Sequence, residues 1–233
     1  MKKGDLKKQE ILQTAETLFC RNGYEETSIQ DILDILHTSK GSFYHHYASK
    51  EQLLEAMCDQ RATVLAEQAA AEAVSGDAVK DMNTLLSGMM PLRGERLTFL
   101  LMLLPVFALP EGRNVRSAYC HALTEAFYPP VRETVDQGNQ SDAFFCTWPD
   151  VQAKICLRLA NDLWCDICEE ILRCEEAGTL ADPGDLLSLL DPVRNIIEKI
   201  LGAPYGCLEI MNLTELKMLT EQIHLHWRQG KKG

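Results

Sequence analysis

Apolar side chains recur along almost the whole chain with the spacing of an α-helix, and no stretch alternates strongly enough to predict a strand. Side chains three and four positions apart share one face of a helix, so this spacing predicts amphipathic helices packed around a common core. The sequence therefore predicts an all-α fold. Beyond residue 75 the expected helices span residues 78–90, 95–109, 115–137, 150–176, 184–201 and 213–227. Pro105 and Pro129-Pro130 fall inside two of them and are expected to kink or divide those helices.

The first fifty residues contain three short helical segments. In residues 11–19 the apolar side chains share one face, and Asn22-Gly23 then provides a stop signal. Hydroxyl residues that can cap a helix precede a second segment at residues 29–36, a third that ends near Tyr47, and a long helix that reaches about residue 74. Three short helices in this order have the dimensions of a helix-turn-helix unit.

The third segment carries the side chains that a DNA-binding helix needs. Phosphate contacts call for hydroxyls, cations and amides at helix N-termini, and base reading calls for small or hydrogen-bonding side chains. The segment supplies them through Ser39, Lys40, Gly41, Ser42, Tyr44 and His45. Composition alone leaves open a second interpretation, a capped surface helix with an aromatic core face.

Many positions of residues 6–60 agree, in order and spacing and without a gap, with one known domain. These positions are Ile11-Leu12, Ala15, Leu18-Phe19, Asn22-Gly23-Tyr24, Thr27-Ser28, Ser39-Lys40-Gly41, Tyr44, His46-Tyr47, Ser49-Lys50-Glu51 and Leu53-Leu54. The segment resembles the N-terminal DNA-binding domain of the tetracycline-repressor (TetR) family. The resemblance implies a transcriptional regulator, most often a ligand-responsive repressor that binds a palindromic operator as a homodimer.

The resemblance also implies roles for single residues. Thr27 and Ser28 would bind phosphate at the start of the second helix, and Tyr44 and Lys50 would be further phosphate contacts. Four residues would face the bases or the wall of the DNA groove: Lys40, Gly41, Ser42 and His45. With the capping Ser39, the predicted DNA-binding set is Thr27, Ser28, Ser39, Lys40, Gly41, Ser42, Tyr44, His45 and Lys50. In the same way, Phe43 and Tyr47 are expected in the core, and His46 at the helix junction.

The sequence departs from the family pattern in the turn between the second and third helices. His37 stands where the family usually has a glycine with positive φ, and a histidine adopts that left-handed geometry at some cost. Leu33 and Leu36 stand where the family tends to have alanines. We therefore expect a reshaped turn and wider spacing between the first two helices, with an effect on the placement of the recognition helix.

The charge of the chain is unevenly distributed. The formal net charge is -11, which is unfavourable for binding a polyanion, but Lys/Arg and Asp/Glu balance within residues 1–50. All of the net negative charge therefore lies in residues 51–233. Four lysines are expected to form a basic arm: Lys2, Lys3, Lys7 and Lys8. This distribution predicts weak binding to nonspecific DNA and a modest dependence on salt.

The resemblance implies three regions. The DNA-binding domain spans residues 1–50, with the connecting helix starting there and running to about residue 60. Residues 51–204 form a helical ligand-binding and dimerisation domain, and residues 205–233 a C-terminal extension with one amphipathic helix. Helices 150–176 and 184–201 would pair with their copies in a four-helix interface, through two apolar stripes: Ile155, Leu159, Leu163, Ile167 and Ile171, and Leu186, Leu187, Leu190, Val193, Ile196, Ile197 and Ile200.

A small-molecule effector is expected between helices 95–109 and 115–137 and the start of helix 150–176. The aromatic, Met and His side chains available to line such a pocket are Phe99, Met102, Phe107, Tyr119, His121, Phe127 and Trp164. The competing interpretation is that the apolar ones are ordinary core residues. A TetR-like chain that acts through a protein partner instead of an operator remains an alternative.

The nine cysteines indicate a reducing compartment, because an odd number cannot all pair and a chain of 233 residues does not need disulfides. No segment is apolar and long enough for a membrane span, and no signal-peptide pattern follows the first lysines, so we expect a cytoplasmic protein. No enzyme motif is present, and neither metal nor cofactor is expected. Thiol or metal sensing at Cys165 and Cys168, which share a helix face, is the alternative to buried reduced cysteines.

Overall fold

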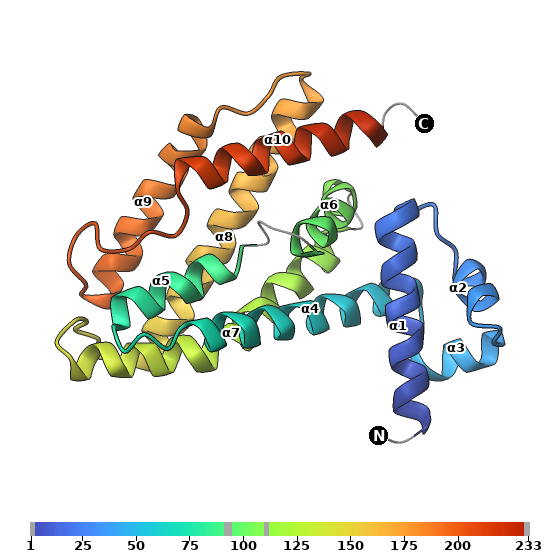
Figure 1. Ribbon diagram of the computed structural model, residues 1–233, viewed down its shortest axis with the longest axis horizontal. Coiled ribbons are helices and arrows are strands. Elements are labelled where there is room, and N and C mark those ends of the chain that lie inside the picture. The colour runs from blue at the N-terminus through green and yellow to red at the C-terminus, as the bar shows by residue number, and fades with distance from the viewer. Residues whose placement is uncertain (1–2, 91–94, 110–111, 231–233) are drawn as a thin grey trace. The chain divides into compact units, whose positions relative to one another are not determined.

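The computed structural model describes residues 3–90, 95–109 and 112–230, and all regular structure in these ranges is helical (Figure 1). The all-α prediction is confirmed. The helices are α1 (Lys3–Asn22), α2 (Ile29–Ile35), α3 (Lys40–His46), α4 (Lys50–Glu72), α5 (Ala78–Gly88), α6 (Glu95–Ala108), α7 (Gly112–Gln140), α8 (Pro149–Glu176), α9 (Pro183–Leu201) and α10 (Leu213–Gly230).

Helices α5 to α10 begin and end within three residues of the predicted bounds. Of the two outcomes expected at these prolines, division does not occur, because α6 continues through Pro105 and α7 through Pro129-Pro130. A kink at these positions stays a prediction. Each proline removes only one backbone donor, and in α7 many helical residues stand on either side of the pair. The carbonyl of Pro130 accepts a hydrogen bond from the Thr134 hydroxyl one turn later.

The chain divides into two compact units. The first unit combines residues 1–61 with residues 93–121, and the second combines residues 62–92 with residues 122–233. In the first unit α1 packs against α2 and α6, and α2 packs against α3. The largest side chains fully buried in this unit include Ile11, Phe19, Ile32, Phe43 and Tyr47. The three short helices therefore share a core of their own.

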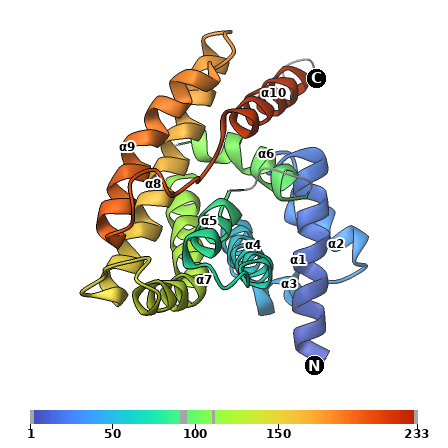
Figure 2. The same ribbon diagram turned by 60° about the vertical axis from the view of Figure 1, so that its left-hand side comes forward.

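In the second unit α8 packs against α9, and α10 packs against both (Figures 1 and 2). This packing buries some members of the two predicted apolar stripes and leaves others exposed. Six of their members are buried within the chain: Leu163, Ile167, Ile171, Leu186, Leu190 and Ile197. Ile155 on α8 and Ile196 on α9 stay exposed, as do Val151 and Leu189, which the stripes did not include. An apolar surface thus remains on the paired helices.

A buried carboxylate anchors the segment that follows α9. Gly202 ends α9 with a left-handed φ of 63°, and Glu198 then accepts hydrogen bonds from the amides of Gly206 and Leu208, both at 3.0 Å. Asn83 on α5 bonds the same segment through the carbonyl of Cys207 and the amide of Glu209. These bonds satisfy polar backbone groups that the turn would otherwise leave without partners.

The nine cysteines form no disulfide in the structure. Cys156 and Cys168 are buried in α8, whereas Cys165 and Cys174 are partly exposed. Burial raises the pKa of the Cys156 thiol to about 12, which keeps it protonated at neutral pH. Within the described ranges, no three His, Cys, Asp or Glu side chains are grouped so that they could hold a metal ion, and no helix is long and apolar enough to cross a membrane.

Candidate nucleic-acid interface

A capping box fixes the start of α2. Ser28 is the N-cap residue, and its hydroxyl accepts a hydrogen bond from the Asp31 amide at 3.2 Å. The Asp31 carboxylate in turn accepts from the amide and the hydroxyl of Ser28, each at 2.7 Å. These hydrogen bonds, and most of all the one from the Ser28 hydroxyl, hold the pKa of the Asp31 carboxyl below its ordinary value. Ser28 is exposed, so a phosphate could approach its backbone at the N-terminal end of α2.

The structure corrects the prediction for Thr27. Its side chain is 0% exposed, and its hydroxyl donates to the carbonyl of Gly23 at 2.8 Å. A second contact reaches the carbonyl of Leu18 at 3.5 Å. A hydroxyl buried in this way cannot bind phosphate. Thr27 instead ties the entry of α2 to the end of α1, and Ser28 alone provides the cap.

The turn between α2 and α3 forms at His37. This residue has φ 46°, so the left-handed geometry expected at the family's glycine position is confirmed. The amide of His37 bonds the carbonyl of Asp34 at 3.3 Å, and the amide of Thr38 bonds the carbonyl of Leu33 at 3.1 Å. This pair of bonds is the Schellman motif, which usually places glycine at the left-handed position. A histidine thus occupies a glycine position without loss of the motif.

Helix α3 has a buried face and an exposed face. Ser39 caps its first turn by accepting from the Ser42 amide at 3.3 Å, and Phe43 and the following Tyr47 are buried as predicted. The hydroxyl of Tyr47 donates to the carbonyl of Lys8 at 3.3 Å, and burial raises its pKa to about 12. The aromatic side chains therefore hold α3 against the rest of the helical unit.

The opposite face of α3 is presented to solvent. Its exposed residues follow the i, i+1, i+4, i+5 pattern of one helix face: Lys40, Gly41, Tyr44 and His45. Tyr44 is 54% exposed, and Ser42 is half-buried beside this face. A Cβ placed on Gly41 would meet only the Ser39 Oγ, at 3.8 Å, so the glycine leaves open space on the leading turn. The structure thus brings three predicted base- or groove-facing residues, Lys40, Gly41 and His45, onto one surface with the predicted phosphate contact Tyr44.

Lys50, a predicted phosphate contact, makes contacts within its own domain. Its Nζ lies 4.1 Å from the centroid of the Tyr24 ring and 3.5 Å from the carbonyl of Glu25. Desolvation lowers the pKa of the Lys50 ammonium, against the opposing effect of nearby glutamates such as Glu25 and Glu26. The side chain is half-buried. To contact phosphate, its ammonium would have to exchange the carbonyl of Glu25 for a phosphate oxygen.

The predicted basic arm is part of a helix. Lys2 lies outside the described residues, and α1 already begins at Lys3. Lys7 forms an ion pair with Glu10 at 3.0 Å, and the Nζ of Lys8 lies 5.7 Å from the centroid of the Tyr47 ring. The helical propensity of this charged stretch extends α1 by two turns beyond its apolar face. For residues 3–8 the expected basic arm is therefore the first part of α1.

The residues predicted to line a ligand pocket are mostly core. Five of them are buried: Phe99, Met102, Tyr119, Phe127 and Trp164. Phe107 is half-buried and His121 is exposed, and the seven are divided between the two compact units. Neither of two pockets found in the described chain is lined by any of them. The predicted pocket thus finds no support there.

A connection between helices of the first unit has no signal in the sequence. Arg61 on α4 bonds the carboxylate of Glu16 on α1, with Nε at 2.5 Å, and its guanidinium lies 5.5 Å from the centroid of the Phe99 ring on α6. Both charged side chains are largely buried. The partners are 45 residues apart in the chain, so only the fold reveals that they meet.

The surface on α3 belongs to the segment that matches a known family. Residues 11–57 match the sequence model described as bacterial regulatory proteins, tetR family. The match includes α2, the turn at His37, α3 and the start of α4. It covers the predicted DNA-binding residues from Thr27 to Lys50.

Curated relatives align with roughly a quarter of this chain or less. The HTH-type transcriptional repressor KstR2 of Mycolicibacterium smegmatis is 43% identical over 49 residues, 21% of this chain and 24% of its own. The repressor AcnR of Corynebacterium diphtheriae is 32% identical over 62 residues, 27% of this chain and 33% of its own. For QacR of Staphylococcus aureus the identity is 41% over 46 residues, 20% and 24% of the two chains. The aligned part is thus a third or less of each relative.

Solved structures extend the likeness to the remaining helices. The structure of RolR with bound resorcinol aligns with a TM-score of 0.57 over 93% of this chain and 94% of its own, at 13% identity. A Mesorhizobium loti protein assigned to the TetR family aligns with a TM-score of 0.53 over 98% of both chains, also at 13% identity. At this level of identity the likeness shows the fold alone.

Proposed function

We propose that the chain, whose residues 11–57 match the TetR family model, is a TetR-family transcriptional regulator that binds a palindromic operator as a homodimer and represses transcription in the cytoplasm until a small molecule binds. The exposed face of α3 is the observation that carries the proposal. Lys40 and His45 supply donors for bases or phosphates, Gly41 leaves room for the groove wall, and Tyr44 supplies a hydroxyl. Ser28 adds a phosphate site at the start of α2.

The exposed apolar surface of the paired helices α8 and α9 supports the homodimer. Val151 and Ile155 lie one turn apart on α8, and Leu189 and Ile196 lie two turns apart on α9. A row of exposed aliphatic side chains on packed helices is typical of a protein interface. Two copies of this surface would form a four-helix interface related by twofold symmetry. The symmetry would match that of a palindromic operator.

Arg61 offers a route by which a ligand could change DNA affinity. It joins α4 to α1 through Glu16 and to α6 through Phe99. In the proposed mechanism, ligand binding shifts α4 or α6, and this ion pair transmits the shift to the helices that carry α3. Arg61→Met would then leave operator binding in place and weaken the response to ligand.

The experiment that tests the proposal measures binding to the DNA upstream of the protein's own gene by electrophoretic mobility shift. Tyr44→Ala is expected to weaken binding by about 5- to 150-fold, the effect of one lost contact of about 1–3 kcal/mol. Tyr205→Ala is the matched control, because this tyrosine is 82% exposed in the segment after α9. Absence of any shifted complex, or equal loss in both variants, would contradict the assignment of α3 as the DNA-reading helix and favour a protein partner.

A further inference from the structure

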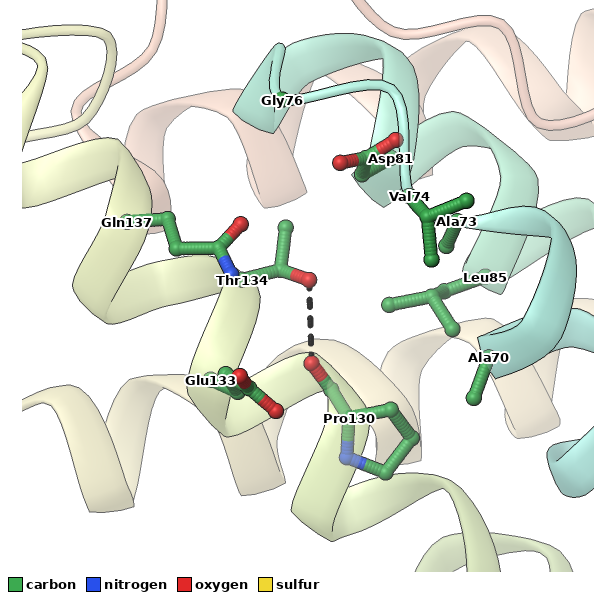
Figure 3. A pocket seen from close by; sticks show the side chains of 10 residues that line it. All are labelled: Ala70, Ala73, Val74, Gly76, Asp81, Leu85, Pro130, Glu133, Thr134 and Gln137. Carbon is green, nitrogen blue, oxygen red and sulfur yellow. Dashed lines mark hydrogen bonds between the residues drawn. The ribbon is translucent and has the colours of Figure 1, made fainter.

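A cavity of about 390 Å³ opens in the second compact unit, between the end of α4, the start of α5 and the second half of α7 (Figure 3). Its lining residues are Ala70, Ala73, Val74, Gly76, Asp81, Leu85, Pro130, Glu133, Thr134 and Gln137. The volume is in the range of pockets that hold small molecules in proteins. None of these residues has a role in the DNA-binding surface.

The charge of the cavity has one sign. Asp81 and Glu133 line it, and no Lys, Arg or His is among the residues that do. The Asp81 side chain is 2% exposed, and its Oδ1 accepts from the amide and the hydroxyl of Ser75, at 2.9 and 2.6 Å. In Figure 3 one oxygen of the Asp81 carboxylate points toward the side of the cavity formed by Thr134 and Gln137. A carboxylate at this depth attracts a cation more strongly than one in bulk water, because the surroundings screen it less.

The helix ends around the cavity add to this preference. Ala70 and Ala73 belong to the last turn of the 23-residue helix α4 and the residue after it, where the helix dipole places partial negative charge. The opposite, positive end of α5 is already neutralised, because Asp77 Oδ1 accepts from the amides of Val79 and Lys80. Lys80 itself is exposed and does not line the cavity.

The remaining wall is apolar and small. Leu85 is buried, and the other apolar lining residues are Ala70, Ala73, Val74 and Pro130 (Figure 3). The Thr134 hydroxyl already donates to the carbonyl of Pro130 at 3.0 Å, so it offers a ligand only an acceptor. Glu133 stands exposed at the rim. The cavity therefore combines an apolar wall with hydrogen-bond acceptors and two carboxylates.

We propose that this cavity binds a compact organic cation, an amine with an apolar body, whose ammonium group is held between Asp81 and Glu133. This cation would be the effector that changes operator affinity, an inference that rests on the proposed function. Its apolar body would cover Leu85, Val74, Ala70 and Ala73. The site differs from the aromatic pocket expected from the sequence, with which it shares no residue.

The test compares three probes with the same apolar body: 4-phenylbutylamine, 4-phenylbutanol and 4-phenylbutanoate. Isothermal titration calorimetry of the full chain should show the amine binding about tenfold tighter than the alcohol, and the carboxylate not at all, because only the ammonium gains a charge-assisted bond to a carboxylate. Equal affinities for the amine and the alcohol, or no binding of the amine at millimolar concentration, would overturn the proposal.

Variants locate the site. Asp81→Asn keeps an acceptor oxygen for Ser75. Glu133→Gln changes a residue at the exposed rim and should leave the fold intact. Each should reduce the affinity for the amine to near that for the alcohol. Glu221→Gln on α10 removes the same charge from an exposed position outside the cavity and is the matched control. An amine affinity that both cavity variants leave unchanged would place the binding elsewhere and refute this assignment.

A mobility-shift assay on the same proteins separates this proposal from the proposed function. If the amine binds through Asp81 and Glu133 but no operator is found, the site stands and its role as an effector site fails. If the operator binds and the amine does not, the regulator stands and the cation site is refuted. Ala70→Phe, which fills the cavity, should block amine binding while leaving operator binding unchanged.

Discussion

The turn at His37 allows a quantitative test of how α2 and α3 are joined. Its φ of 46° places an L-residue in the left-handed region, and the side chain is exposed, so substitution removes no packing. The two variants of interest are His37→Gly and His37→Ala. Alanine retains the conflict between Cβ and the following carbonyl, whereas glycine removes it.

The expected difference follows from two opposing effects. The left-handed conformation costs an L-residue roughly 1–2 kcal/mol. Glycine avoids this cost but loses roughly 0.5–1 kcal/mol more conformational entropy on folding. His37→Gly should therefore be more stable than His37→Ala by about 0.5–1 kcal/mol, which raises the midpoint of thermal unfolding by about 1–4 °C in a chain of this size. The wild-type protein should fall between the two or close to the alanine variant.

Thermal unfolding of the full-length proteins, followed by circular dichroism, measures the difference. Amide hydrogen exchange of α2 and α3 checks that the change is local to the turn, with slower exchange in His37→Gly. Operator affinity should stay within a few-fold of wild type in the glycine variant, because the Schellman bonds of the turn are backbone bonds. An alanine variant as stable as the glycine variant would show that this turn is not left-handed.

Three further predictions concern the same domain. Thr27→Val should destabilise the protein by about 1 kcal/mol, the net value of a buried hydrogen bond, while the folded protein keeps its operator affinity. Calorimetry measures the stability and mobility shift the affinity. Lost affinity at unchanged stability would mean that the hydroxyl contacts DNA. Glu25→Gln with Glu26→Gln should raise the affinity for nonspecific DNA several-fold at low salt, measured by fluorescence anisotropy, because both carboxylates lie near Lys50 and would repel phosphate. The pKa of the Asp31 carboxyl is lower in the folded state than its ordinary value of 3.8. The ionised carboxylate therefore stabilises the start of α2 above pH 3.8, and this stabilisation is lost as the pH falls below that value. A Ser28 amide signal that does not titrate in this range by NMR would contradict the capping box.

The helices could be predicted from the sequence because their signals are local. Caps, apolar spacing and stop residues lie within a few positions of the ends that they determine, as at Ser28, Ser39 and Gly202. The exposed face of α3 was predictable for the same reason. Thr27 was not distinguishable from Ser28, since both are hydroxyl residues before a helix. Only the packing of α2 on α1 determines which of the two is buried.

Features that depend on distant segments could not be predicted. Arg61 and Glu16 meet through the fold, and nothing in their local sequence marks either as a partner. The ligand prediction relied largely on aromatic side chains, and of these Phe99, Tyr119, Phe127 and Trp164 are buried in the structure. One cavity in the described part of the chain is lined in part by alanines, a valine and a leucine near helix ends, with Asp81 as its buried charge. In sequence these are ordinary helix-end residues.

The central claim is that the exposed face of α3 enters the DNA groove, and Gly41→Glu tests it most directly. A Cβ at this position meets only the Ser39 Oγ, at 3.8 Å, and loss of a helix glycine together with a carboxylate in the first turn should stabilise α3 by about 1 kcal/mol. The same side chain would bring bulk and negative charge against DNA. We predict that this variant unfolds at a temperature equal to or above wild type and loses operator affinity by about 100-fold, since opposing like charges in an interface costs several kcal/mol. Unchanged operator affinity in a stably folded Gly41→Glu protein would contradict the claim.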